Sequence, residues 1–162
     1  MSIQEYIKNY QSARKKETIF LLVWGGISVI IGIIARYLPL LDAFWQAFLY
    51  PFVGLGFGML IEAILNMVTY RRKKLFSNAD PITSEKLRAI AQVKKLDLRR
   101  SFDSILFIVG FMLFILGGVI TTQVFSAGMG MGLLLQSTVL FVKDNWALWR
   151  ARLYVVELEE TL

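Results

Sequence analysis

Cysteine and histidine are both absent from this chain of 162 residues. Without thiols or imidazoles the chain can form no disulfide and no thiolate or histidine metal site, and it lacks the usual haem ligands. It also lacks the imidazole base on which most nucleophilic catalytic sites depend. We therefore expect no catalytic residue, no metal site and no cofactor, and we predict that the protein is not an enzyme.

Polar sequence is scarce as well. Hydrophobic residues make up 56% of the chain and the mean hydropathy is +0.57, which is more apolar surface than a soluble core of this size needs. The excess has to face lipid. Four apolar runs each approach the roughly 20 residues that a helix needs to cross a bilayer. They are Ile19–Tyr37, Phe44–Thr69, Phe102–Val124 and Ala127–Val142.

These runs are apolar on every side, whereas the strands of a membrane barrel alternate apolar and polar residues. Hydrogen bonding within the segment also favours helices in lipid. The predicted fold class is therefore an all-α integral membrane protein with four transmembrane helices. Because the fourth run is short, we expect its helix to continue past Lys143 toward Trp149, and we favour helix over irregular structure for the tail that follows.

Basic residues are almost missing from one side of the predicted membrane. In a four-span topology, 17 of the 18 Lys and Arg residues fall on the side that holds both chain ends and the loop between the second and third spans. Only Arg36 falls on the other side. Short loops rich in Lys and Arg remain in the cytoplasm, so both termini are predicted to be cytoplasmic.

Short amphipathic helices are expected on the cytoplasmic side. The first would begin at Ser2, which together with Glu5 resembles a capping box, and it is expected to lie on the membrane surface. In the central loop, Asp80 can cap a second helix that has Pro81 at its first position. A stripe of apolar residues among the basic ones gives this second helix an amphipathic character.

The second and fourth runs share three alternating glycines followed by a polar residue four positions on. At a constant offset of 74, the set Gly54, Gly56, Gly58, Glu62 matches the set Gly128, Gly130, Gly132, Gln136. The first and third runs align at an offset of 85, which pairs Gly25 with Gly110 and Gly32 with Gly117. We interpret the chain as two tandem parallel hairpin repeats, residues 1–76 and 77–162, related by an axis along the membrane normal. The alternative is a chance match between apolar helices that contain glycine.

All twelve glycines lie in the predicted spans and none lies in a loop, which is the reverse of their use in soluble proteins. Small residues four apart let helix backbones approach closely in a solvent that provides no hydrophobic drive for association. Ligand binding by these glycines is the alternative. The residues with a predicted helix-packing role are Gly25, Gly32, Gly54, Gly56, Gly58, Gly110, Gly117, Gly128, Gly130 and Gly132.

The segment from Trp45 to Glu62, in which Tyr50-Pro51 precedes the alternating glycines, resembles the second helix of the two-transmembrane hairpin domain found in some bacterial membrane proteins. The resemblance covers the first hairpin clearly and the second as a diverged repeat, which keeps the glycines and Gln136 but lacks the proline and the tryptophan. That family commonly has His where Glu62 stands here, so no role of an imidazole is carried over. The resemblance implies a bacterial inner membrane protein that serves in anchoring or signalling, without an assigned chemistry.

Glu62 is the acidic residue that lies well inside an apolar run. It precedes Arg71 by nine residues, or about 13 Å along a helix, so its carboxylate should be neutral, paired or facing a water-filled cavity. One interpretation is a proton or cation site. The interpretation that we favour is a structural hydrogen bond to Gln136 or to Asn66, one turn along the same helix.

Basic runs on the cytoplasmic side can attract anionic lipid headgroups, at about 1 kcal/mol per residue. The alternative is that they only set the topology. Nucleic acid is not expected as a partner, because no binding motif and no aromatic platform accompanies the charges. The predicted lipid-contact residues are Arg71, Arg72, Lys73, Lys74, Lys94, Lys95, Arg99 and Arg100.

Two functions remain open on this sequence. The leading hypothesis is a small non-enzymatic membrane scaffold or accessory subunit, a homo-oligomer or part of a larger membrane complex, that acts through glycine-lined helix packing. The alternative is a small oligomeric channel or a proton- or cation-coupled transporter that uses Glu62 and Gln136. A water-accessible cavity at Glu62 would favour transport, whereas a dry Glu62–Gln136 contact and a glycine face covered by another chain would favour the scaffold.

Overall fold

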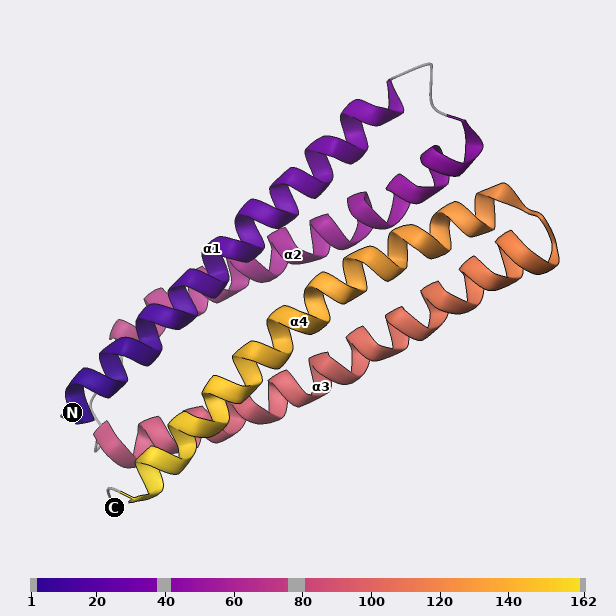
Figure 1. Cartoon of the computed structure of the whole chain (residues 1–162). Helices are drawn as coiled ribbons and strands as arrows, with labels where there is room; N and C mark the ends of the chain where they lie inside the picture. Colours follow the sequence, from indigo (N-terminus) through magenta and orange to yellow (C-terminus); the bar gives the residue numbers. More distant parts are fainter. Residues whose placement is uncertain (1–2, 38–41, 76–80, 161–162) are drawn as a thin grey trace.

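The structure is a computed structural model that describes residues 3–37, 42–75 and 81–160. Each of its long helices contains a segment long and apolar enough to cross a membrane. The prediction of an all-α integral membrane protein with four such helices is confirmed. The elements are α1 (Ile3–Arg36), α2 (Ala43–Leu75), α3 (Pro81–Ile115), the π-helical turn η1 (Leu116–Ile120) and α4 (Val124–Glu160) (Figure 1).

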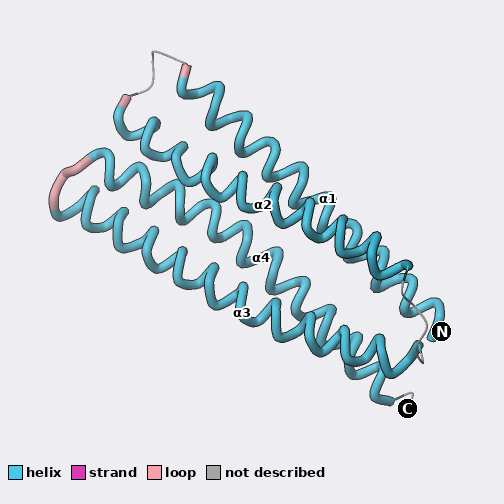
Figure 2. The backbone as a smooth tube through the Cα atoms, turned by 180° about the vertical axis from the view of Figure 1, so that it is seen from behind, coloured by secondary structure: helices cyan, strands magenta, loops and turns pink. Residues whose placement is uncertain are grey.

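The helices form two antiparallel hairpins that lie side by side. α1 packs on α2, α3 packs on α4, and the two hairpins meet through α2 and α4, which leaves α1 and α3 on the flanks. Figures 1 and 2 show both chain ends at one end of the molecule, and η1 with the start of α4 at the opposite end. We call residues 3–18, 81–101 and 143–160 the terminal half, and residues 19–37, 43–69 and 102–142 the apolar half.

The short amphipathic helices expected before the first and third runs are not separate elements. They form the first turns of α1 and α3, which continue without a break into the apolar half. Neither segment has a glycine or an internal proline before its apolar run, so nothing interrupts the helix at the membrane boundary. The helices contain 33 to 37 residues. At 1.5 Å per residue they are about 50–55 Å long, well beyond the roughly 30 Å of hydrocarbon.

The starts of α2 and α4 are set by local polar groups. Asp42 caps α2, because its Oδ1 accepts a hydrogen bond from the backbone N–H of Trp45 at 3.1 Å. Before α4, the backbone N–H and the hydroxyl of Thr121 both donate to the carbonyl of Leu116 at 2.8 Å, and Thr122 has a φ of 52°. This turn reverses the chain tightly. At its far end α4 reaches Glu160, which confirms the helix expected beyond Lys143.

The terminal half has its own small apolar core. Leu96 of α3 packs with Leu148 and Ala151 of α4. Tyr10 of α1 stacks on Tyr154 of α4 with ring centroids 4.0 Å apart. Stacking contributes stability beyond that of the apolar area the two rings bury. The first turns of α1 therefore pack on the second hairpin, and the expectation that they lie on the membrane surface differs from what the structure shows.

The apolar half presents large side chains to its surroundings on all sides. Ile34 of α1, Ile61 of α2 and Ile108 of α3 are 57%, 58% and 60% exposed. So much apolar surface is unusual in a soluble protein and is what lipid would cover in a membrane.

Candidate functional site

Each hairpin is closed by a pair of glycines from its two helices. A Cβ added at Gly25 would lie 2.9 Å from the carbonyl oxygen of Gly56, and one added at Gly56 would lie 3.0 Å from the carbonyl oxygen of Gly25. In the second hairpin, the corresponding distances are 3.0 Å from Gly110 to the oxygen of Gly130 and 2.7 Å in the reverse direction. None of the four positions has room for a side chain, so the helix backbones touch there.

A second close approach in each hairpin lies toward the end of the molecule that holds η1. A Cβ on Gly32 of α1 would fall 2.2 Å from Cγ2 of Val53 on α2, and a Cβ on Gly117 would fall 2.5 Å from the backbone nitrogen of Ala127 on α4. Both contacts again need the smaller residue, because a methyl group would overlap an atom of the opposing helix.

Gly128 and Gly132 join the two hairpins to each other. A Cβ on Gly128 would lie 2.1 Å from the carbonyl oxygen of Phe44, and one on Gly132 would lie 2.2 Å from that of Phe48. The backbone of α4 thus rests directly on the backbone of α2. These two glycines are what allows the second hairpin to dock on the first.

Gly54 and Gly58 of α2 behave differently. Apart from the chain neighbours and the local backbone of α2 itself, no atom of the described structure lies within 4 Å of a Cβ added at either position. Ile61 and Leu65, which are 58% and 59% exposed, continue the same side of α2 at helical spacing. Eight of the ten glycines predicted to pack helices therefore do so within the chain, and this pair lies on a face that the described residues leave uncovered.

Gln136 is fully buried, and its partners come from α1. Trp24 Nε1 donates to its Oε1 at 3.1 Å, and its Nε2 donates to Ser28 Oγ at 3.0 Å. Both ends of the amide are thereby occupied. The hydrogen bond that we expected between Gln136 and Glu62 is not formed, because α4 presents the amide to α1 whereas the Glu62 carboxylate is bonded to residues of α2 and α3.

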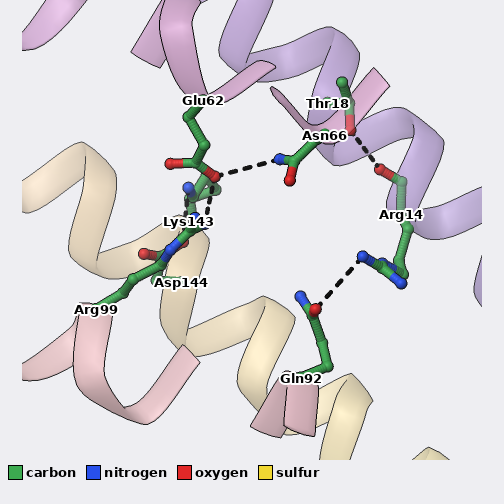
Figure 3. Close-up of polar contacts among 8 residues, drawn as sticks. All are labelled: Arg14, Thr18, Glu62, Asn66, Gln92, Arg99, Lys143 and Asp144. Carbon is green, nitrogen blue, oxygen red and sulfur yellow. Dashed lines mark hydrogen bonds and ion pairs between the residues drawn. The ribbon is translucent and has the colours of Figure 1, made fainter. Parts of the chain in front are cut away.

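Glu62 is paired with a cation that the sequence interpretation had assigned to lipid. Its Oε1 accepts hydrogen bonds from the guanidinium of Arg99 on α3 and, at 3.4 Å, from the amide of Asn66 one turn along α2 (Figure 3). The expected partner Asn66 is therefore confirmed. Arg99 supplies the counter-ion, and the two charged side chains are each only 24% exposed.

The Glu62–Arg99 pair belongs to a wider set of polar groups where the apolar and terminal halves meet. Figure 3 shows side chains from all four helices converging there, and they line a cavity of about 20 Å³, which has space for about one water molecule. Arg14 donates to Gln92 at 3.3 Å, and Arg150 pairs with Glu17. We call the set the polar layer: Arg14, Glu17, Glu62, Asn66, Gln92, Arg99, Asp103, Lys143, Asp144 and Arg150.

Two acidic residues of the polar layer were missed by the sequence interpretation. Asp103 of α3 and Asp144 of α4 are 4% and 3% exposed and interact with each other. Lys143 Nζ lies 2.6 Å from Oδ1 of Asp144 and brings positive charge beside them. The available signal was that Asp103 lies one turn after Arg99, and therefore on the same side of α3 as the partner of Glu62.

The predicted lipid-contact residues are divided by the structure. The side chains of Arg71, Arg72, Lys73 and Lys74 lie outside the described residues, and Lys94 and Lys95 are exposed on α3. Arg99 is held by Glu62. The guanidinium of Arg100 lies 5.8 Å from the centroid of the Phe141 ring, within cation–π range.

Comparison with protein-family models, with curated proteins and with solved structures finds no match for this chain. The function is therefore proposed from the geometry of the described residues.

Proposed function

We propose that this protein is a non-enzymatic membrane scaffold or accessory subunit that associates with a second copy of itself through Gly54 and Gly58 on α2. A contrast between two equivalent glycine pairs carries this proposal. Gly128 and Gly132 seat α4 on the backbone of α2, whereas Gly54 and Gly58, at the same places in the first hairpin, have no atom of the described structure beside them. A close-packing face left uncovered within one chain is suited to a helix from another.

The proposal includes a tandem repeat of the hairpin. Gly25 meets Gly56 as Gly110 meets Gly130, and the offsets of 85 and 74 that relate these contacts are the offsets at which the sequence halves align. The contacts of Gly32 with Val53 and of Gly117 with Ala127 are related by the same two offsets. Equivalent contacts at two independent places in each hairpin support duplication over chance.

We also propose that both termini are cytoplasmic and that the membrane is the bacterial inner membrane. The concentration of 17 basic residues toward one side supports the orientation. The hairpin resemblance of the first half supports the choice of membrane.

A symmetric dimer is the simplest association that this face allows. In a twofold interface the same patch of each copy meets its counterpart, and small residues four apart on one helix are suited to that geometry in lipid. The exposed Ile61 and Leu65 would extend the interface along α2. The scaffold would then be a bundle of eight helices with the two copies of α2 at its centre.

The transport alternative has weaker support. A cation that approached Glu62 would be repelled by the positive charge of Arg99 beside it. The adjoining cavity has a volume of only about 20 Å³. Gln136 is 0% exposed and has partners at both ends of its amide. Glu62 is therefore neutralised by a cation of the protein itself, and both ends of the Gln136 amide are occupied.

The proposal is tested with three glycine substitutions of equal size. Gly58→Leu places a large side chain on the uncovered face, so the chain should fold but the dimer should be lost. Gly26→Leu is the matched control, because Gly26 also has open space around it but lies on α1; this variant should remain a dimer. Gly132→Leu should fail to fold, since its Cβ would lie 2.2 Å from the carbonyl oxygen of Phe48.

Mass measurement of the protein in mild detergent, together with cross-linking in bilayers, gives the oligomeric state. A wild-type chain that is monomeric under both conditions would refute self-association, and so would dimers that Gly58→Leu and Gly26→Leu leave equally intact. If Gly58→Leu instead lost a different protein that co-purifies with the wild type, that protein, and not a second copy of the chain, would be the partner of this face.

A further inference from the structure

A groove lies on the seam between the two hairpins, between α1 and α4. Its volume is about 510 Å³, within the roughly 300–1,000 Å³ that is usual for small-molecule sites. Lining residues of α4 extend from Thr138 to Arg150, or about 18 Å at 1.5 Å per residue. The groove is therefore elongated, and it is lined by both hairpins.

The groove changes character along its length. Its large aliphatic and phenyl side chains, Phe20 on α1 and Val139 and Val142 on α4, lie in the apolar half of the molecule. Its charged members, which include Lys16 and Arg150, lie in the terminal half. An amphipathic ligand with one long apolar part and one polar end would match both parts of this lining, and only in one direction.

The charge at the polar end is positive. Lys16, Lys143 and Arg150 line the groove together with a single acidic residue, Glu17. Glu17 is already paired with Arg150, and Lys143 lies against Asp144. Lys16 is exposed and has no acidic partner among the described residues, so it is the cation with the greatest freedom to bind an anion.

Trp146 marks the level at which the polar end of a ligand would lie. It lines the groove about one turn after Lys143 and one turn before Arg150, and it is 61% exposed. Tryptophan is enriched at the headgroup level of membranes because its ring is largely apolar but carries one N–H donor. Trp146 therefore lies among the cations at the polar end of the groove, and aromatic and basic residues also occur together at the edge of a bilayer leaflet.

From these features we infer that the groove is a binding site for one anionic phospholipid of the leaflet that faces the terminal half. An acyl chain lies along Phe20, Val139 and Val142, and the phosphate accepts hydrogen bonds from Lys16. The bound lipid fills the groove between α1 and α4, beside the hydrogen bonds that Gln136 makes with α1, and so adds to what holds the two hairpins together. This inference does not depend on self-association through Gly58.

Lipid retention by the purified protein in mild detergent tests the site, with phosphatidylglycerol and phosphatidylcholine added in separate experiments. Native mass spectrometry counts the lipids retained on each chain. We expect one phosphatidylglycerol per chain and much less phosphatidylcholine. Lys16→Gln should weaken phosphatidylglycerol binding about fivefold, the equivalent of about 1 kcal/mol for one basic residue. Lys15→Gln, an exposed neighbour that does not line the groove, should leave it unchanged.

A second pair of variants tests the apolar part without touching a charge. Thr138→Trp fills the groove from an exposed position and should block retention of the lipid, whereas Ile64→Trp, on the lipid-facing surface of α2, should not. Equal retention of the two phospholipids would overturn the inference, and so would equal losses in Lys16→Gln and Lys15→Gln. Normal retention in a folded Thr138→Trp variant would place the lipid elsewhere and likewise defeat it.

Discussion

Arg99 on α3 donates a hydrogen bond to Oε1 of Glu62 on α2, although these two helices do not pack on each other in the described structure. The long side chains bridge the two hairpins at the level where the apolar half ends. Arg14 and Arg150 make comparable links from α1 to α3 and from α4 to α1. Glycine packing therefore joins the hairpins in the apolar half, and ion pairs and polar side chains join them in the polar layer.

The first prediction concerns this ion pair. Glu62→Gln should fold but lose about 1 kcal/mol of stability, because Arg99 keeps an amide partner but loses its counter-ion. Arg99→Gln should cost a similar amount. The double variant should lose less than the sum of the two, with a coupling of about 1 kcal/mol between the positions. Thermal unfolding of the four proteins in one detergent measures the cycle, and strictly additive losses would mean that the pair contributes nothing.

The second prediction concerns the buried amide on α4. Gln136→Leu removes the partners of Trp24 Nε1 and Ser28 Oγ, and we expect a loss of about 1–2 kcal/mol. Thr138→Ala is the control, because its hydroxyl is exposed and bonds only the carbonyl of Leu134 on its own helix. Unfolding in detergent should separate the two variants. If the two variants were equally stable, the hydrogen bonds of Gln136 would make no net contribution to the stability of the protein.

The third prediction follows from the equivalent glycine contacts. Gly25→Ala and Gly110→Ala should destabilise the protein by similar amounts, because each methyl group would lie within about 3 Å of a carbonyl oxygen, 2.9 Å from Gly56 and 3.0 Å from Gly130. Gly26→Ala has open space and should be neutral or slightly stabilising, since alanine is the better helix former. A large loss at only one of the first two positions would argue against equivalent hairpins.

The fourth prediction tests the orientation. The chain contains no cysteine, so a single introduced thiol reports its own side of the membrane. Ser126→Cys, at the end that holds η1, should react with an impermeant reagent applied to intact cells. Ser12→Cys, in the terminal half, should react only after the cells are opened. The reverse pattern would place both termini outside and contradict the cytoplasmic orientation.

The four membrane-crossing helices could be predicted because lipid leaves few options for a long apolar segment. Its backbone must bond internally, so length and composition suffice to predict the helix. The close contacts at Gly25 and Gly110 were similarly accessible, because glycine in a membrane helix has few uses other than packing.

The partners of polar residues could not be predicted in the same way. A buried amide such as Gln136 requires a hydrogen bond, but each residue turns the helix by about 100°, so a small rotation of α4 decides which helix it faces. Arg99 shows the same limit, since its place beside basic neighbours suggested lipid while its side of α3 faces Glu62. The break that we wrongly expected between the amphipathic helices and the spans has another cause. Apolar runs end at the membrane surface, whereas a helix ends only at a capping or helix-breaking residue, and α1 and α3 have none there.

The lack of glycine in the terminal half has a mechanical consequence. All twelve glycines lie between positions 25 and 132, and α1 and α4 extend about 25 Å beyond the apolar half as unbroken helix. A helix without a hinge transmits torsion along its axis instead of absorbing it. A few degrees of rotation of α1 or α4 within the lipid would therefore turn Tyr10 against Tyr154 in the terminal half. A movement that begins inside the membrane would thus alter the contact between these two rings.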